Sequence, residues 1–593
     1  MVIKRSYEES TLEEKSLRCI IIGAGVSGIL MAHHLREAFG DRVGIRILEK
    51  NAEIGGTCYA SSSEIQSYLK AVVLHYRLDP YIHFNSKVEE AVWREDSSTW
   101  SVSVEGRGKF DCDILVNAGG ILNNPKFPNL KNIDSFKGQL VHTAAWDNNI
   151  DVKNKRVAII GAGASAIQVL PEIQSAAANV DIYIRTPSWI SPPAGAQFNG
   201  EHNHIYTEEE KAQFRDDPNH SLRTRKDMES SFNCMYRAFF KGSDEQKQFV
   251  KKLDTHMREL IHSEGLQKGL IPSFEVGCRR INPGERYLEA LQRDNVEPVF
   301  SDIQEVTPTG IRDADGTERP VDIIIAATGF DTSFRPRFPI IGRNGVDLRE
   351  LWKTNPVSYC GLAVSGFPNY LIFLGPNTPI ANGSLIGALE ATGDYFIRLL
   401  RKMMTQQVSS FNIRADVEAD FDMHTQDFMQ RMVWTGSCRS WFKNDDGKVT
   451  AVWPGSGLHY REFLQSDRWE DWEWKYTANR FQYWGLGFST VETVSEGQER
   501  DLSYYIQSHP NLSREVLEMV DCKRDKIING DDSDESAGEL VSKEFKASEY
   551  EEEESCKTSE TSWDDEDLLK KDPVTGKDSR TKVSLPEVAA FSA

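Results

Sequence analysis

The chain has 593 residues and a formal net charge of −21, with 39% hydrophobic and 10% aromatic residues. A chain of this length is too long to fold around a single hydrophobic core, and it leaves room for about two to four domains of ordinary globular composition. The negative charge disfavours nucleic-acid partners. No apolar run is long enough for a membrane span, and no basic segment precedes the first apolar run. The sequence therefore predicts neither a signal peptide nor a transmembrane segment, and a cytoplasmic location.

The cysteines are scattered and include no C-x-x-C pair. We therefore expect no zinc site or other metal centre, no disulfide framework, and a reducing compartment. The nine positions are Cys19, Cys58, Cys112, Cys234, Cys278, Cys360, Cys438, Cys522 and Cys556.

Most of the excess negative charge lies near the C-terminus. Residues 531–570 carry 16 Asp and Glu against 4 Lys and Arg, and apolar periodicity is weak there. Such a composition cannot offset the entropy lost on ordering, so we expect residues 511–593 to be a disordered acidic tail. This tail is available for contacts with partners that the sequence does not identify.

The first organised segment is "RCIIIGAGVSGILMAHHLREAFGDRVGIRILEK". A β-branched run leads into Gly23, Gly25 and Gly28 at G-x-G-x-x-G spacing, followed by a helical pattern. These glycines permit a tight turn, close approach of a pyrophosphate, and packing of the helix on the strand. The next strand ends in Glu49, which is placed to accept hydrogen bonds from a ribose diol. The segment predicts a dinucleotide-binding unit.

A second unit follows in "KRVAIIGAGASAIQVLPEIQSAAANVDIYIRTPSW". Here Gly161 and Gly163 are followed by Ala166, the tolerated variant at the third position. The second strand ends in Arg185 where the first unit has Glu49, and an arginine there can hold the 2′-phosphate of NADP. One unit ending in an acid and one in arginine predict two different dinucleotides, FAD and NADPH.

Two further apolar strands end in small residues, as expected where the chain leaves close to a bound nucleotide. They are "DILVNAGG" before Pro125 and "VDIIIAATGFD" at residues 321–331. This pairing favours two interleaved nucleotide-binding domains of the α/β class.

These segments, with Gly55-Gly56-Thr57 and "AGGILNNPKFP", occur in an order that resembles the flavin-containing monooxygenase superfamily, and specifically the Baeyer-Villiger monooxygenases. The resemblance covers roughly residues 17 to 506, and its later stretches, including "GCRRINPGERYLEAL" and "WTGSCRSWFK", resemble the fungal secondary-metabolism branch. The fingerprint of these enzymes, F-x-G-x-x-x-H-x-x-x-W-[PD], is met at every position. Its residues here are Phe136, Gly138, His142, Trp146 and Asp147.

The resemblance implies two interleaved Rossmann-like domains, for FAD and NADP, with a helical insertion and the acidic tail. The implied parts are an N-terminal arm (1–16), the first part of the FAD domain (17–150, ending in the 136–147 linker motif), the NADP domain (151–330) with an insertion at about 190–270, the completion of the FAD domain with a substrate-pocket region (331–510), and the tail (511–593).

The resemblance also implies a set of site residues. Arg280 is the implied active-site arginine, and His142 of the linker motif is implied to couple nicotinamide binding to domain position instead of transferring protons. The implied cofactor-binding residues are Gly23, Gly25, Val26, Ser27, Gly28, Glu49, Gly56, Thr57, Val88, Gly161, Gly163, Ser165, Ala166, Arg185, Thr186, Arg279, Thr328 and Gly329.

The sequence departs from the family pattern after Thr57. The family has an aromatic next, and then a few dozen residues that include an aspartate partner of the active-site arginine. Here Cys58 follows, and the chain passes at once to a helical pattern with an apolar face between Ile65 and Tyr76. The intervening segment is missing, and with it the expected carboxylate partner of Arg280.

The implied activity is an FAD- and NADPH-dependent monooxygenation. A C4a-peroxyflavin would insert one oxygen atom of O2 into an organic substrate, by Baeyer-Villiger oxidation of a polyketide or terpenoid ketone in fungal secondary metabolism. Epoxidation, and N- or S-hydroxylation by the same flavin chemistry, stay open. Two other functions also stay open. One is a plain NADPH oxidase or disulfide reductase, and the other is a nucleotide-binding homologue whose catalysis is impaired because the segment is missing.

Overall fold

The computed structural model describes residues 16–55, 62–147, 149–192, 206–378, 382–485, 487–489, 491–492 and 501–506. The described residues up to 485 form one compact unit, and those from 487 onward belong to a second unit. All sheets and helices named below belong to the first unit. The predicted N-terminal arm, apart from residue 16, and the predicted acidic tail lie outside the described residues.

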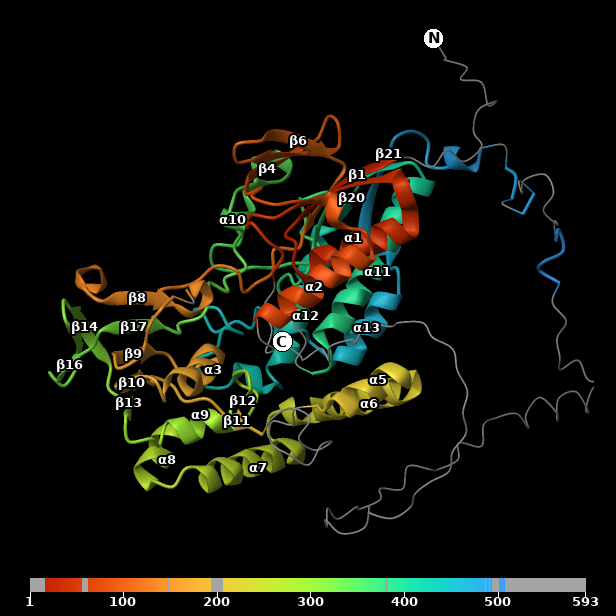
Figure 1. The fold of residues 1–593 in the computed structure, drawn as a ribbon. Coiled ribbons are helices and arrows are strands. Elements are labelled where there is room, and N and C mark those ends of the chain that lie inside the picture. The colour runs from red at the N-terminus through yellow and green to blue at the C-terminus, as the bar shows by residue number, and fades with distance from the viewer. Residues whose placement is uncertain are drawn as a thin grey trace, which may run out of the picture. The chain divides into compact units, whose positions relative to one another are not determined.

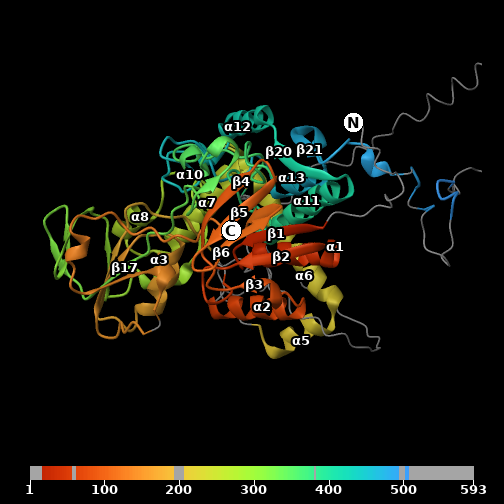
Figure 2. The same ribbon diagram turned by 90° about the horizontal axis from the view of Figure 1, so that it is seen from above.

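The first parallel sheet has the strand order β19-β7-β1-β2-β3, and the succession from β1 to β3 can be followed in Figure 2. Alternate side chains of β1 enter different cores, because successive residues of a strand face opposite sides. Ile21 packs with the helices, whereas Ile20 faces an antiparallel sheet. The strands are β1 (Leu17–Ile22), β2 (Val43–Leu48), β3 (Ile82–His83), β7 (Ile114–Asn117) and β19 (Tyr370–Ile372).

Helices cover one face of this sheet and strands the other. Helix α1 (Val26–Phe39) lies against α11 (Leu385–Thr405), as Figure 1 shows. This second layer is a sheet of order β18-β4-β5-β6, in which β4, β5 and β6 are antiparallel and β18 pairs in parallel with β4. It buries Trp100 completely, and the Trp100 indole donates to the carbonyl of Pro368. Its strands are β4 (Val88–Arg94), β5 (Thr99–Val104), β6 (Gly108–Cys112) and β18 (Ile340–Ile341).

The second parallel sheet has the order β13-β10-β9-β17-β8, and Figure 1 shows it with β8 at the top and β13 at the bottom. Three antiparallel strands, β14 (Ile303–Thr307), β15 (Gly310–Asp313) and β16 (Glu318–Pro320), share a core with one face. The strands of the parallel sheet are β8 (Gln139–His142), β9 (Arg156–Ile160), β10 (Asn179–Tyr183), β13 (Val296–Val299) and β17 (Ile323–Ala326).

The other face of the second sheet packs against the helices α3 (Ala164–Ile173), α7 (Asp244–Leu260) and α9 (Glu285–Ala290). The stretch between β11 (Ile190–Ser191) and β12 (Asn282–Pro283), which contains the predicted insertion, is largely helical where it is described, and β11 pairs with β12. Its helices are α5 (Glu208–Asp216), α6 (Pro218–Asn233), α7 (Asp244–Leu260) and α8 (Glu264–Leu270). The remaining elements are α2 (Ser62–His75), α3 (Ala164–Ile173), α9 (Glu285–Ala290), α10 (Leu348–Leu351), α12 (Ala415–Met429), α13 (Gly457–Gln465), β20 (Val408–Ile413) and β21 (Trp472–Tyr476).

The chain passes from the first sheet to the second and later returns, so the predicted interleaving is confirmed. The two connections run alongside each other, where Lys126 N donates to Gly329 O at 2.9 Å and Asp331 N donates to Asn124 O at 2.9 Å. Strand β19, which follows the return, completes the first sheet beside β7. The domain boundary at residue 150 stays a prediction, and β8 of the linker motif belongs to the second sheet.

Helix α2 confirms the helical pattern after residue 62. Leu69 and Val73 are buried, as the predicted apolar face requires, whereas Tyr76 follows the helix and is exposed. Within the described ranges, no helix has the length and apolar character needed to cross a bilayer. The cytoplasmic location stays a prediction.

The sequence predicts no disulfide framework, but the structure contains a disulfide. Cys278 and Cys438 are bonded although 160 residues separate them, and their Cα atoms lie 6.1 Å apart. Spacing along the chain reveals only neighbouring cysteines, whereas this pair is brought together by the packing of the loop before β12 against the segment after α12. In the described part of the chain, no three His, Cys, Asp or Glu side chains gather in a metal-binding cluster.

Candidate active site

The first glycine turn is formed by close contacts between backbones. Gly23 has φ +102°, and a Cβ there would lie 2.7 Å from the carbonyl oxygen of Ala118 at the end of β7. A Cβ at Gly28 would lie 2.0 Å from Gly23 O. At Gly25 the nearest atom, Gly55 O, would be 3.3 Å away. Gly23 and Gly28 are therefore required by packing, and a side chain at Gly25 would also be crowded by the backbone of Gly55.

Glu49 lies where the sequence placed it, directly after β2, and its side chain is buried. One carboxylate oxygen accepts a hydrogen bond from Ala24 N at 2.9 Å, and the other accepts from Asn51 N at 2.9 Å. Each oxygen keeps a lone pair, so the carboxylate braces the turn and still has capacity for ribose hydroxyls. Ser86 N donates to Glu49 O at 2.8 Å, which brings the start of β4 at Val88 close to this site.

The N-terminus of α1 suits a phosphate group. The cap residue Gly25 contributes no side-chain hydrogen bond, and the first turn, which includes Val26 and Ser27, contains no acidic residue. The amide groups of this turn and the helix dipole therefore favour an anion. These features fit the pyrophosphate of a dinucleotide. The predicted partners Gly56 and Thr57 lie outside the described residues.

The second turn repeats the arrangement with a more open approach. Gly161 has φ +126°, and a Cβ there would lie 2.4 Å from Ala327 O at the end of β17, whereas Gly163 has no atom within 4 Å of its Cβ position. Ala166 is completely buried against the sheet, and Ser165 precedes it in the uncapped first turn of α3.

Ser188 belongs to this site although sequence reasoning missed it. Its hydroxyl donates to Ala162 O at 2.9 Å and so holds the second glycine turn from the other side. A lone serine in a loop carries no signal of such a contact in the sequence.

The structure brings together three of the predicted cofactor-binding residues, Arg185, Thr186 and Arg279. Arg279 donates from Nη1 to the carbonyl oxygens of Thr186 and Pro187, each at 3.0 Å. Arg185 is exposed at the end of its strand. Burial, and secondarily the charge of Arg185, lowers the pKa of Arg279 below its usual value. Two cations on one loop pair form a site that attracts a multiply charged anion.

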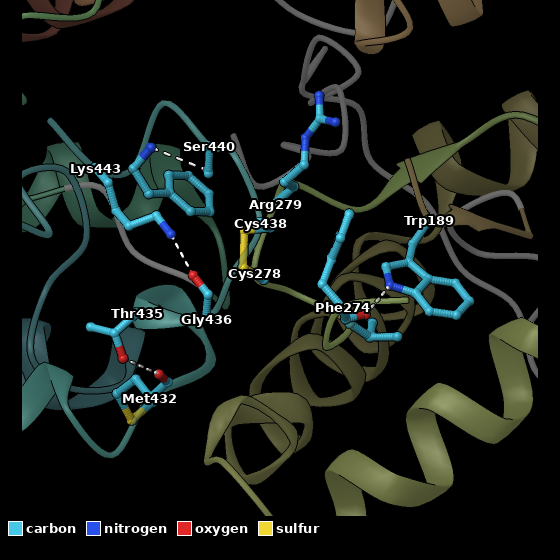
Figure 3. The surroundings of a disulfide bond; sticks show 12 residues. Trp189, Phe274, Cys278, Arg279, Met432, Thr435, Gly436, Cys438, Ser440 and Lys443 are labelled. Carbon is cyan, nitrogen blue, oxygen red and sulfur yellow. Dashed lines mark hydrogen bonds between the residues drawn. A yellow bond between two sulfur atoms is a disulfide. The ribbon is translucent and has the colours of Figure 1, made fainter. Parts of the chain in front are cut away.

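Arg280 follows directly in the same loop. Its carbonyl oxygen accepts a hydrogen bond from Asn282 Nδ2 at 3.1 Å, and Asn282 N donates to Trp189 O at 3.3 Å. The disulfide lies on the other side, at Cys278, and Figure 3 shows the Arg279 side chain extending away from its sulfur atoms. The role of Arg280 stays a prediction.

The fingerprint residues form the edge strand of the second sheet and its flanking turns. At Gly138 a Cβ would lie 2.4 Å from Asp322 O and 2.5 Å from the Phe136 ring. Trp146 is 37% exposed, and Asp147 Oδ1 accepts from Asn149 N at 2.9 Å. Gly138 and Phe136 are therefore packing residues of this edge.

His142 ends β8 and lies beside both interdomain connections. Its ring packs edge-on against Phe127 and Phe330, at centroid distances of 5.1 and 6.3 Å. Nδ1 accepts a hydrogen bond from Ala144 N at 3.1 Å, so the neutral ring carries its proton on Nε2. Burial lowers the pKa of His142, while the neighbouring carbonyls of the two connections oppose that shift.

The last two predicted residues, Thr328 and Gly329, lie in the returning connection. Thr328 Oγ1 donates to Lys126 O at 2.5 Å, and Gly329 has φ +75°. They join the connections beside His142, which places the fingerprint histidine at the junction of the two sheets.

The sequence and fold have close relatives among known proteins. A model of the flavin-binding monooxygenase-like family matches residues 57–195. The FAD-binding monooxygenase stcW of Emericella nidulans is 38% identical over 561 residues, covering 87% of this chain and 91% of its own. The chain belongs to this flavin-binding monooxygenase-like family. A Baeyer-Villiger monooxygenase of Pseudomonas aeruginosa is 31% identical over 489 residues, covering 77% and 91%.

Among solved structures, one described as "OTEMO complex with FAD and NADP" superposes on this family member with a TM-score of 0.68 at 24% identity, covering 78% of this chain and 100% of its own. The predicted family and α/β fold are confirmed, and the chain is a flavin-binding monooxygenase. The roles of the individual site residues stay predictions.

The two glycines of the second turn allow a matched test. Gly161→Ala introduces a side chain at positive φ against a backbone oxygen, so the free energy of unfolding should fall by about 3 kcal/mol. Gly163→Ala should leave it within about 1 kcal/mol, because the space is open, but should raise the Kd for NADP+ about tenfold by filling the approach to the phosphates. Urea unfolding and calorimetric titration measure both quantities. Equal destabilisation by the two variants would contradict this account.

The buried histidine predicts a pH dependence of stability. The pKa of His142 in the folded chain lies below its ordinary value of 6.5. Its contribution to the free energy of unfolding is therefore fully present above pH 6.5. It is lost as the pH falls through the folded pKa, since the unfolded chain then binds a proton that the folded chain excludes. His142→Asn keeps an acceptor for Ala144 N and removes the titrating ring. Unfolding titrations from about pH 7.5 to about pH 5 should show a shallower fall in the variant than in the wild type. If the free energy of unfolding falls equally with pH in both proteins, His142 does not contribute to the pH dependence of stability.

Proposed function

We propose that this chain is an FAD- and NADPH-dependent monooxygenase that inserts one oxygen atom of O2 beside the carbonyl of a ketone, giving an ester or lactone. The observation that carries the proposal is the difference between the two nucleotide turns. The first ends in the buried carboxylate of Glu49, and the second ends at the cation pair Arg185 and Arg279. One site therefore suits a ribose diol and the other a 2′-phosphate.

The first site would hold FAD through the residues around Gly25 and Glu49, whose amide groups and carboxylate are described above. Bound FAD supplies two-electron chemistry with NADPH and reaction of its reduced ring with O2. The chain's own contribution there is binding and orientation. Two backbone amides hold the carboxylate of Glu49 in one orientation. This proposed partner of the ribose therefore keeps its position when the cofactor is absent.

The second site would hold NADPH at α3 and at the arginine pair. Arg279 is anchored by two carbonyl oxygens, which leaves its remaining guanidinium donors for the 2′-phosphate. Arg280, the next residue, would stabilise negative charge that develops on the reacting oxygen. Guanidinium suits this role because it stays protonated throughout.

The substrate class is a bulky ketone of polyketide or terpenoid type in fungal secondary metabolism. The support is the similarity to the fungal FAD-binding monooxygenases stcW of Emericella nidulans and moxY of Dothistroma septosporum, the latter 37% identical over 535 residues. A second candidate is oxygenation of an alkene, nitrogen or sulfur, because the same cofactors serve these reactions.

A third candidate is an impaired nucleotide-binding homologue, favoured by the segment missing after Thr57. The alignment with stcW spans 561 positions but only 87% of these 593 residues, so it contains positions without a counterpart in this chain. Purified protein that lacks bound flavin, or that converts NADPH and O2 to hydrogen peroxide alone, would favour this candidate.

Product analysis separates the candidates. The purified holoenzyme is supplied with NADPH, 18O2 and parallel ketone, alkene and sulfide probes, and products are identified by mass spectrometry. We expect one 18O atom in an ester or lactone. In the Arg280→Ala control, NADPH should still bleach the flavin while the oxygenated product falls at least about a hundredfold. Turnover of the alkene without ester or lactone would select the second candidate.

The cofactor preference tests the arginine assignment. Arg185→Ala should raise the KM for NADPH about tenfold or more and leave the KM for NADH almost unchanged, because only the 2′-phosphate loses a charged partner. Flavin reduction measured by stopped flow with each nucleotide gives both values. Equal effects on NADPH and NADH would show that Arg185 does not face the 2′-phosphate.

A further inference from the structure

The disulfide joins the arginine loop to a distant part of the chain. Cys278 directly precedes Arg279 and Arg280, and its partner Cys438 lies in the segment after α12 (Figure 3). Both cysteines are buried, with exposures of 0% and 4%. The bond therefore lies inside the packed core and adjoins the residues that the NADP site needs.

The arginine loop is held at both ends. On its C-terminal side, β12 pairs with β11, and the first residue of β12, Asn282, donates to Arg280 O. On its N-terminal side, Cys278 N donates to Glu275 O at 3.2 Å, and Gly277 turns the chain at φ +90°. The covalent bond at Cys278 is the strongest attachment at this end.

The segment that carries Cys438 has its own attachments to the insertion. Trp434 stacks on Phe239 with ring centroids 5.7 Å apart. Lys241 Nζ donates to Thr435 Oγ1 at 2.5 Å, and Lys241 N donates to Arg431 O at 2.9 Å. Within the segment, Lys443 Nζ donates to Gly436 O at 2.6 Å. This segment is therefore a firm support, and the disulfide transmits its position to the arginine loop.

The surroundings leave little room for two separate thiols. A Cβ added at Gly436 would lie 3.2 Å from Cys278 Sγ and 2.7 Å from Glu275 Oε2. Two sulfur atoms that are no longer bonded must separate to van der Waals contact. Because the core is close-packed, that displacement passes to the neighbouring backbone, which is the arginine loop.

We propose that the Cys278–Cys438 disulfide is a positioning cross-link for Arg279 and Arg280, and that its reduction weakens binding of the 2′-phosphate of NADP(H). The inference rests on the proposed NADP site. A small dithiol opens the bond by exchange. Its two thiols give up two electrons and two protons, its own S–S bond forms, and Cys278 and Cys438 become thiols.

The test uses the full-length holoenzyme and direct titration with NADP+ and NAD+ by calorimetry. Peptide mapping by mass spectrometry without reductant first establishes the Cys278–Cys438 bond. Binding is then measured before and after treatment with a dithiol, with reduction verified by alkylation, and in Cys278→Ser and Cys438→Ser. Cys234→Ser, at an exposed free cysteine, is the matched control. FAD content and unfolding midpoint are recorded for every sample.

Opening the bond should raise the Kd for NADP+ about three- to tenfold, the range expected for a weakened hydrogen bond to a charged group. The Kd for NAD+ should stay unchanged. Cys438→Ser should match Cys278→Ser although Cys438 lies 160 residues away. Cys234→Ser should match the wild type, and the dithiol should have no effect on either serine variant.

The absence of the bond from the peptide map would overturn the inference. So would equal loss of NADP+ and NAD+ binding, which would indicate general loosening. Arg185→Ala distinguishes the proposal from its premise. If this variant leaves the preference for NADP+ intact, the proposed NADP site is wrong. If it removes the preference while the serine variants bind normally, only the cross-link inference fails.

Discussion

Both nucleotide turns depend on one steric constraint, which is the close approach of a third strand to a glycine. The carbonyl oxygens of Ala118 and Ala327 lie 2.7 and 2.4 Å from the Cβ positions of Gly23 and Gly161. Each oxygen stands at the carboxyl end of the strand beside the turn. Any side chain at the glycine would separate turn and strand. The constraint therefore gathers the turn, Glu49 or Arg185, and the interdomain connection at one edge of each sheet, where open α/β sheets bind their ligands.

The two sheets meet where those connections run side by side. Lys126 contacts both Thr328 and Gly329, and His142 ends the strand that adjoins them. A change in the angle between the sheets would alter these hydrogen bonds. A neutral, enclosed histidine at such a junction is placed to respond to domain position. It is poorly placed for exchange of protons with a substrate, because aromatic rings and backbone enclose it.

Much of this arrangement follows from local sequence signals. Glycines at fixed spacing, β-branched runs and the charged residues after them predict both turns, and Glu49 lies where that pattern places it. Contacts between distant segments leave no such signal. Ser188 reaches Ala162, and Cys278 reaches Cys438, only after the sheet and the insertion have packed. The sequence also does not predict strand β8, because a four-residue edge strand inside a family fingerprint shows no distinctive periodicity.

If the second site binds NADP(H) as proposed, the arginine pair explains how it would distinguish two nearly identical nucleotides. Burial and the charge of Arg185 both lower the pKa of Arg279, so the folded chain holds two cations near each other at an energetic disadvantage. A 2′-phosphate compensates that repulsion as well as forming new hydrogen bonds. A nucleotide with a plain 2′-hydroxyl leaves the repulsion in place. Selectivity then comes from both the attraction to one ligand and the uncompensated charge left by the other. It depends on the distance between the two arginines, and therefore on whatever fixes the position of the loop that carries Arg279.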